Sequence, residues 1–396
     1  MMQIDFVPLG FFLFVACLVA IVTRRIGLPY AVGLVTAGIA LSLAGYRSGL
    51  TLTPELIFTF LLPPLVFEAA LNLRWRQFRH EAPLVLTLAF VGTLLSAAVV
   101  AAGMHWLIGW GWQAAMLFGS LIAATDPVSV IAMMKEERAE ERLRFVMEAE
   151  SLVNDGAAAV LFALCAATIG GTDITVETIG LSLLLTVAGG VACGLAVAAA
   201  LLLIAGRSDD HLVELTLTVL AAYGAFGLAE KLGVSGVLAT LAAGMLIGNW
   251  GPGRSLTERG GDAMIRFWDF AAFLANSIIF LLIGGREAAH PFGAYLLPAL
   301  AAILLALAGR AAAIYPLASL FAKGRLAIDG PTRHLLFWGG LRGALALALA
   351  LGVPDDLPEH DALIGAAFAV VAFSIFVQGL TMPMLLRRSG LIANRR

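Results

Sequence analysis

The chain has 396 residues, of which 60% are hydrophobic and 13% are charged, and its formal net charge is −2. Soluble domains carry about 25% charged residues, so this composition excludes a soluble protein and indicates one that crosses a membrane many times. The charge is not gathered into a basic region, which argues against nucleic-acid binding. The three cysteines lie inside apolar runs and indicate neither a disulfide framework nor a metal site.

Apolar runs of about 20 residues, the length that crosses a bilayer as a helix, follow one another along the chain. We predict thirteen spans, near 4–22, 27–45, 55–72, 83–108, 112–134, 146–169, 177–205, 211–231, 235–250, 262–284, 290–321, 332–351 and 360–386. No soluble domain separates them, so residues 1–396 are expected to form a single transmembrane domain. The first run lacks a basic region before it and a small-residue cleavage site, which favours a retained span over a signal peptide.

Basic residues set the predicted orientation, because Lys and Arg favour the cytoplasmic side of a membrane. With the loop after the first span placed inside, only Arg47, Lys231 and Arg286 of the 25 basic residues fall outside, and Arg310 and Arg342 fall within spans. All the others fall inside. We therefore expect an integral protein of the plasma (inner) membrane, with its N-terminus outside and its C-terminus in the cytoplasm.

The span at 55–72 contains the stretch PPLVFEAAL, in which Glu68 lies about one turn from the cytoplasmic end. A charged residue inside a span costs roughly 2.5–3.5 kcal/mol on insertion scales, so such a residue needs an explanation. Glu68 could be functional, or it could be a solvated residue of the membrane interface.

The span at 112–134 contains Thr125-Asp126-Pro127. Pro127 cannot donate a hydrogen bond to the Ala123 carbonyl, and the residue before a proline avoids helical geometry. We predict a break near Thr125 and Asp126, with Asp126 as the N-cap of a half-helix that begins at Pro127. Non-helical backbone is tolerated at membrane depth only where it is buried or lines a cavity, and its freed carbonyls can bind a cation. A simple proline kink with a capping aspartate is the alternative.

The span at 146–169 begins with the polar stretch EAESLVNDG. On a helix, Ser151 and Asp155 share one face, and Glu150 and Asn154 share the adjoining face. Acidic residues favour a helix N-terminus, which is one explanation for Glu150. It does not account for Asp155, which lies farther into the span.

The span at 332–351 contains GGLRGALALAL, where three glycines surround Arg342 midway along the span. This pattern predicts a second broken helix. Interrupted helices in both halves of a chain are typical of inverted-repeat transporters with a site near the bilayer midplane. We expect Arg342 to have a carboxylate partner, whereas the sequence assigns no partner to Arg310.

Together these residues resemble the NhaP-type sodium/proton antiporters of the monovalent cation:proton antiporter family. The resemblance lies in PPLVFEAAL (63–71), TDPVSV (125–130), ESLVNDG (150–156) and GGLRGALALAL (339–349), and in the order of the thirteen spans. It covers nearly the whole chain. It implies an all-α polytopic membrane protein with about 13 transmembrane helices, inverted repeats and two crossed broken helices, as in NhaA-like antiporters.

The resemblance implies that Asp155 binds both the ion and the proton, and that Asp126, Ser151 and the Thr125 carbonyl complete the cation shell. The chemistry agrees, because small hard cations prefer carboxylate, hydroxyl and carbonyl oxygens. One site that holds either a proton or a cation, with access alternating between the two sides, gives exchange without a nucleotide. We find no phosphate-binding loop.

For the supporting residues, the resemblance implies that Asn154 marks the electroneutral branch of the family and pairs with Glu68. Glu150 would form a buried ion pair with Arg342. The family also implies a homodimer, in which a core bundle moves against a dimer-forming scaffold. Many relatives carry a long cytoplasmic tail, and we expect regulation through such a tail not to be encoded here.

We therefore expect a secondary transporter, not an enzyme, that exchanges Na⁺ or Li⁺ for H⁺ across the bilayer without a cofactor. A K⁺/H⁺ antiporter of the same fold is the nearest alternative, because the sequence does not give the volume of the site. A gated cation channel is a more remote one. An intramembrane aspartyl protease could use Asp126 and Asp155 as its dyad, but the GxGD motif is missing and Arg342 would have no role.

Overall fold

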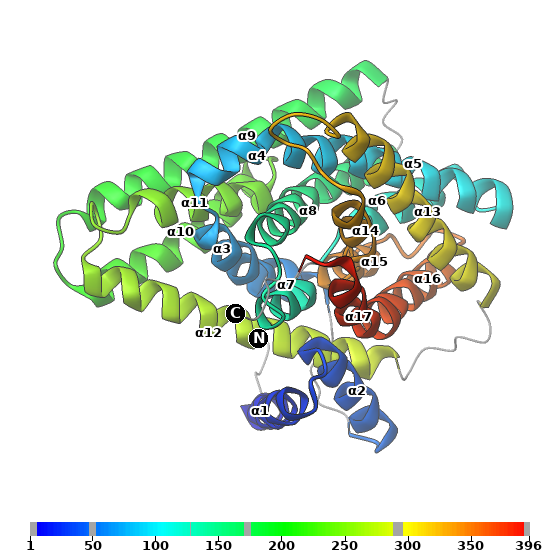
Figure 1. Cartoon of the computed structure of the whole chain (residues 1–396), viewed down its shortest axis with the longest axis horizontal. Helices are drawn as coiled ribbons and strands as arrows, with labels where there is room; N and C mark the ends of the chain where they lie inside the picture. The colour runs from blue at the N-terminus through cyan, green and yellow to red at the C-terminus, as the bar shows by residue number, and fades with distance from the viewer. Residues whose placement is uncertain (1–5, 47–52, 127, 170–175, 288–295, 392–396) are drawn as a thin grey trace.

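The computed structural model describes residues 6–46, 53–126, 128–169, 176–287 and 296–391, and these residues form a helical protein without strands (Figure 1). Consecutive and interrupted helices, taken together, make thirteen segments that follow the predicted spans in order. By length and composition, seven helices among the described residues can cross a membrane, and shorter apolar helices accompany them. The predicted all-α polytopic fold is confirmed.

A first bundle is formed by helices from the beginning and from the middle of the chain. Its members are α1 (Phe6–Ile26), α2 (Tyr30–Leu43), the π-helical η1 (Leu56–Leu61), α3 (Leu62–Asn72), α9 (Val176–Ala205), α10 (His211–Lys231), α11 (Gly236–Trp250) and α12 (Glu258–Glu287). Two pairs pack at close range, α2 against α12 and α9 against α11. A methyl group on Gly38 of α2 would collide with a carbonyl of α12, and one on Gly284 of α12 would collide with a carbonyl of α2. Small residues at such crossings let helix backbones approach closely in a membrane.

A second bundle holds both broken helices. Its members are α4 (Trp75–Leu86), η2 (Thr87–Val91), α5 (Gly92–Gly103), η3 (Met104–Ile108), α6 (Trp112–Ala123), α7 (Val128–Glu136), α8 (Glu141–Ile169), α13 (Leu296–Leu320), α14 (Gly330–Trp338), α15 (Ala344–Leu351), α16 (His360–Phe373), η5 (Ser374–Gln378) and α17 (Gly379–Ser389). Within it α5 packs on both α6 and α13, and α8 packs on α6. The label η denotes a π-helical turn, which often marks a functional site within a helix.

The two bundles meet along α8, which contacts α3 and α11 of the first bundle. In Figure 1, α1 and α2 lie beside α12, while α7, α8, α14 and α15 lie near the middle of the molecule. One passage of the chain between the bundles is described, where Leu73 and Arg74 join α3 to α4 in an extended conformation. The other passages fall at residues 170–175 and 288–295, outside the described residues.

One boundary differs from the prediction. The span predicted to begin near residue 83 begins as a helix at Trp75. The prediction started later because residues 75–81 are polar and are not part of the apolar run, although they are helical. The prolines at 63 and 64 stand in the first turn of α3. Because η1 continues directly into α3, neither proline can donate a backbone hydrogen bond to the carbonyls of the η1 turn before it.

Candidate functional site

Both predicted breaks are present, and they cross one another. The chain leaves helical geometry after Ala123 and resumes as α7, and it leaves again between Trp338 and Ala344. None of the four half-helices exceeds 12 residues, about 18 Å at 1.5 Å per residue, so none spans a bilayer of about 30 Å alone. The predicted start of a half-helix at Pro127 lies outside the described residues.

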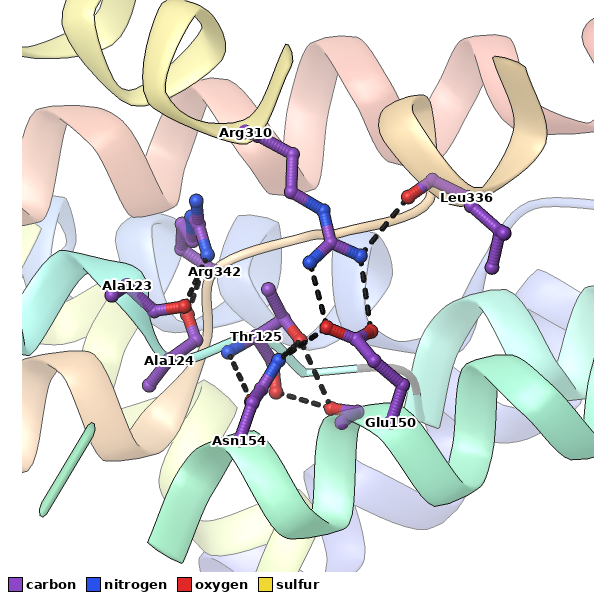
Figure 2. A network of polar contacts seen from close by, with 9 residues as sticks. Ala123, Ala124, Thr125, Glu150, Asn154, Arg310, Leu336 and Arg342 are labelled. Carbon is purple, nitrogen blue, oxygen red and sulfur yellow. Dashed lines mark hydrogen bonds and ion pairs between the residues drawn. The ribbon is translucent and has the colours of Figure 1, made fainter. Parts of the chain in front are cut away.

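Reciprocal hydrogen bonds join the two unwound segments. The Asp126 amide donates to the Leu341 carbonyl at 2.7 Å. In the other direction, the Arg342 guanidinium donates through Nη1 to the carbonyls of Ala123 and Ala124, at 2.8 and 2.9 Å (Figure 2). Each segment thus satisfies backbone groups that the interruption of the other has freed, which is the condition for irregular backbone inside a membrane.

Glycines in the second break make this approach possible. A methyl group at Gly343 would overlap the Asp126 carboxylate, and one at Gly340 would crowd the Arg310 guanidinium. Gly340 and Gly343, two of the three glycines that the sequence places around Arg342, therefore let charged side chains of other segments reach the crossing. The need for glycine here is steric, and it arises from the side chains that neighbouring helices bring to these positions.

α8 supplies the polar groups that hold the first break. The Ser151 hydroxyl donates to the Thr125 carbonyl at 2.5 Å, and the Thr125 hydroxyl donates to Ser151 Oγ at 3.2 Å. The Asn154 Nδ2 donates to Thr125 Oγ1 at 2.7 Å and to Glu150 Oε1 at 2.9 Å, while its Oδ1 accepts from the Thr125 amide at 3.3 Å. Figure 2 shows these groups converging on the unwound segment.

The predicted ion pair between Glu150 and Arg342 is wrong. The partner of Glu150 is Arg310 of α13, whose Nη1 and Nη2 donate to the two carboxylate oxygens at 2.8 and 3.0 Å. Arg310 Nη2 also donates to the Leu336 carbonyl at 3.0 Å, in the last turn of α14. Glu150 and Arg310 are 2% and 6% exposed. Arg342 takes backbone carbonyls instead, because its position in the second break faces the end of α6.

The predicted pairing of Asn154 with Glu68 is also wrong. An amide nitrogen has two hydrogens to donate, and Thr125 and Glu150 take both of them. Glu68 accepts instead from Asn72 Nδ2 at 2.8 Å, one turn along α3. It lies on the wall of a cavity, on the side of the first bundle.

All four predicted cation ligands line the same cavity of about 540 Å³: Thr125, Asp126, Ser151 and Asp155. The supporting residues Glu150, Asn154 and Arg342 are buried and do not line it. In the described structure Asp155 Oδ1 is buried without a hydrogen-bond partner. A carboxylate oxygen in that position needs a proton or a cation, since an unpaired buried charge is costly.

The cavity extends from this crossing to the last turns of α1 and α7. Its outer lining includes Arg24 at the end of α1, Lys135 in the last turn of α7, and the acidic residues Glu148 and Asp269. Charged residues of both signs mark this end as the mouth. An ion could therefore reach Asp155 from that side through a passage whose inner wall is mostly apolar.

One further set of polar contacts was not predicted from the sequence. Gln378, at the end of η5, donates through Nε2 to the Trp338 carbonyl at 3.0 Å, and its Oε1 accepts from the Ser374 hydroxyl at 2.9 Å. The Trp338 indole in turn donates to Thr381 Oγ1 at 2.9 Å. These contacts fix the end of α14, where the second break begins. An uncharged amide in the middle of an apolar run was the available signal.

Comparison with known proteins gives one consistent result. A family model described as "Sodium/hydrogen exchanger, transmembrane" matches residues 12–388. The chain is 38% identical to the Na⁺/H⁺ antiporter ApNhaP of Aphanothece halophytica, over 93% of this chain and 71% of that protein. It is equally identical, with the same coverage, to the low-affinity Na⁺/H⁺ antiporter NhaS1 of a Synechocystis species.

Among solved structures, the fold is similar to that of the sodium proton antiporter MjNhaP1 from Methanocaldococcus jannaschii at pH 8. The TM-score is 0.75 and the match covers 98% of each chain, at 19% sequence identity. At that identity the likeness concerns the fold alone. A polytopic helical fold with this arrangement agrees with the segments described above.

Proposed function

Because the chain belongs to the family of transmembrane sodium/hydrogen exchangers, we propose that it exchanges Na⁺ for H⁺ across the membrane. It is a transporter and not an enzyme, and its family implies no cofactor. The observation that carries the proposal is the environment of Asp155. Its buried Oδ1 has no hydrogen-bond partner in the described structure. Its side chain lines a cavity together with a second carboxylate, a hydroxyl group and an unwound backbone segment. These are the oxygen ligands that small cations prefer.

In the proposed mechanism, Asp155 carries the transported species. When it is ionised, a cation binds between Asp155, Asp126 and the oxygens of Ser151 and Thr125. When it is protonated, the cation loses its main ligand and leaves. Na⁺ and H⁺ therefore compete for one carboxylate, and a change of access while either is bound completes the exchange.

A count of charges supports one-for-one exchange. Around the crossing lie three carboxylates, of Asp126, Glu150 and Asp155, and two guanidinium groups, of Arg310 and Arg342. If all are ionised, one negative charge is left over, so one proton or one monovalent cation neutralises the site. At position 154 an asparagine stands where a second aspartate would add another charge. The exchange is electroneutral on this reasoning.

The cation is proposed to be Na⁺, with Li⁺ as a second substrate, because ApNhaP and NhaS1 are named Na⁺/H⁺ antiporters. K⁺/H⁺ exchange by the same fold is the competing proposal. A channel is disfavoured by a single buried site built asymmetrically from several helices, since a channel needs a continuous pore.

We place the cavity mouth on the cytoplasmic side, because the loops that carry most of the basic residues are at that end. The proposed location is the plasma (inner) membrane, with the N-terminus outside. The whole chain would act as one transporter unit, and two copies would form a homodimer through the first bundle while the second bundle moves.

The test is transport by the purified protein in liposomes that hold an imposed pH gradient and a pH-sensitive dye. The wild type is compared with Asp155→Asn, and with Asp262→Asn as a matched control, since Asp262 is exposed at the start of α12 outside the cavity. Sodium should dissipate the gradient for the wild type and the control, and not for Asp155→Asn.

Other outcomes have separate meanings. Dissipation by potassium alone would keep the mechanism and replace the substrate. Sodium uptake driven by a membrane voltage without a pH gradient would refute electroneutral exchange. If no cation moves protons at any pH between 5 and 9, the exchange proposal fails.

A further inference from the structure

We propose that the first turns of α4 form a binding site for the headgroup of an anionic phospholipid. The argument rests on a cluster of basic side chains, on a hollow between them, and on apolar surface that continues from it. It does not depend on which ion the protein transports.

Four basic residues stand within seven positions where α4 begins. They are Arg74, Arg76, Arg79 and His80, and together with Gln77 they line a surface hollow of about 490 Å³. No acidic residue lies in the first turn of α4. Guanidinium groups bind phosphate through paired hydrogen bonds, so this cluster is complementary to a phosphodiester.

Two of the four basic side chains have no partner in the described part of the chain, whereas His80 Nδ1 contacts Glu81 Oε1 at 3.2 Å. Arg76 and Arg79 are exposed, and in the described part of the chain neither forms an ion pair or hydrogen bond through its side chain. Arg74 contacts Glu141 at 3.0 Å, but both side chains are more than half exposed, and such pairs are weak. A phosphate can therefore take these guanidinium groups without breaking a buried interaction.

Position favours a lipid over a soluble anion. Trp75 is 41% exposed and lies 5.9 Å from Trp250, measured between ring centroids. Tryptophans at the end of a span lie at the level of the lipid headgroups. Beyond the basic turn, the same helical segment exposes Leu86, Val91 and Leu94. The surface thus offers cations for a headgroup and then an apolar face for an acyl chain, in the order that a phospholipid requires.

The site also adjoins the described passage between the two bundles. Asn249 of α11 holds this passage, since its Oδ1 accepts from the Trp75 amide at 2.7 Å and its Nδ2 donates to the Leu73 carbonyl at 2.8 Å. A headgroup on Arg74 and Arg76 would lie at the point where the second bundle is attached to the first. We therefore expect the bound lipid to affect transport as well as stability.

The experiment compares lipid binding by the full-length wild type, Arg76→Gln/Arg79→Gln, and a matched control, Arg254→Gln/Arg259→Gln. The control loses the same charge from two exposed positions, Arg254 before α12 and Arg259 in its first turn. The purified proteins are titrated with phosphatidylglycerol, with phosphatidylcholine, and with inorganic phosphate, and retained lipid is counted by native mass spectrometry. Thermal stability is followed in the same samples.

Wild type and control should bind phosphatidylglycerol saturably and melt at a higher temperature with it. The α4 variant should bind it about thirtyfold more weakly, because each basic residue near an anionic surface contributes roughly fivefold. Arg76→Lys/Arg79→Lys should restore much of the binding, which also covers the case of a poorly folded glutamine variant.

Three results would overturn the proposal. Equal weakening in the control would show a general charge effect. Equal effects of phosphatidylcholine would remove the requirement for an anionic headgroup. Stabilisation by inorganic phosphate at the same concentration would indicate a soluble ligand and not a lipid.

Discussion

Arg310→Leu should destabilise this protein strongly, because it leaves the Glu150 carboxylate buried without its cation. The change removes two charge-assisted hydrogen bonds to Glu150 and one to the Leu336 carbonyl. Both charged groups are almost fully buried, at 2% and 6% exposure, so water cannot replace the lost partner. Removing one member of such a pair typically costs about 3–5 kcal/mol, which for a protein of this size corresponds to a fall in Tm of roughly 4–6 °C.

The partner assignment can be tested directly by a double-mutant cycle in detergent, with Tm read from tryptophan fluorescence. Glu150→Gln/Arg310→Leu removes both charges, so it should be more stable than Arg310→Leu alone, with a coupling of about 2 kcal/mol or more. The same cycle with Arg342→Gln in place of Arg310→Leu should give a clearly smaller coupling. A larger coupling of Glu150 to Arg342, or no loss of stability in Arg310→Leu, would refute the reasoning.

Three further outcomes are expected. Gly343→Ala places a methyl group against the Asp126 carboxylate. The sodium concentration for half-maximal exchange should therefore rise at least tenfold while the protein still folds. An unchanged concentration in liposome assays would contradict the proposed crowding. Gln378→Leu leaves the partly buried Trp338 carbonyl without its donor, which should cost about 1 kcal/mol in thermal unfolding. A loss below about 0.5 kcal/mol would show that the contact is replaceable. Asp329 caps α14 by accepting from the Thr332 amide at 2.9 Å, and the hydrogen bonds from Thr332 hold the pKa of Asp329 below its usual value. A carboxylate whose pKa is lowered in the folded state stabilises that state above the pKa of the unfolded chain, and this stabilisation is lost as the pH falls through the folded value. Asp329→Ala should therefore cost about 1 kcal/mol of stability at pH 7 and progressively less below about pH 4. A loss of stability that does not depend on pH would contradict the cap.

The sequence predicted the segments and their breaks for reasons that are local. An apolar run long enough to span a bilayer becomes a helix because the bilayer offers no other partner for its backbone, which is why thirteen helical segments appear in the predicted order. The sequence places a proline in the first break and glycines in the second, and both residue types disfavour regular helix because of their covalent structure. The residue types of the site follow from the same local reading, and Thr125, Asp126, Ser151 and Asp155 are found on one cavity wall.

Which charged groups meet could be decided only by the tertiary structure. Glu150 pairs with Arg310, a residue 160 positions away, and not with Arg342, although both arginines are buried and both lie mid-span. The choice depends on where α13 passes, on the room that Gly340 leaves for Arg310, and on the carbonyls that the end of α6 presents to Arg342. Likewise, Asn154 does not donate a hydrogen bond to Glu68, because Thr125 and Glu150 accept from both hydrogens of its amide nitrogen. Hydropathy and motif spacing fix the order of segments along the chain, whereas pairing depends on distances in space between helices, which no local pattern encodes.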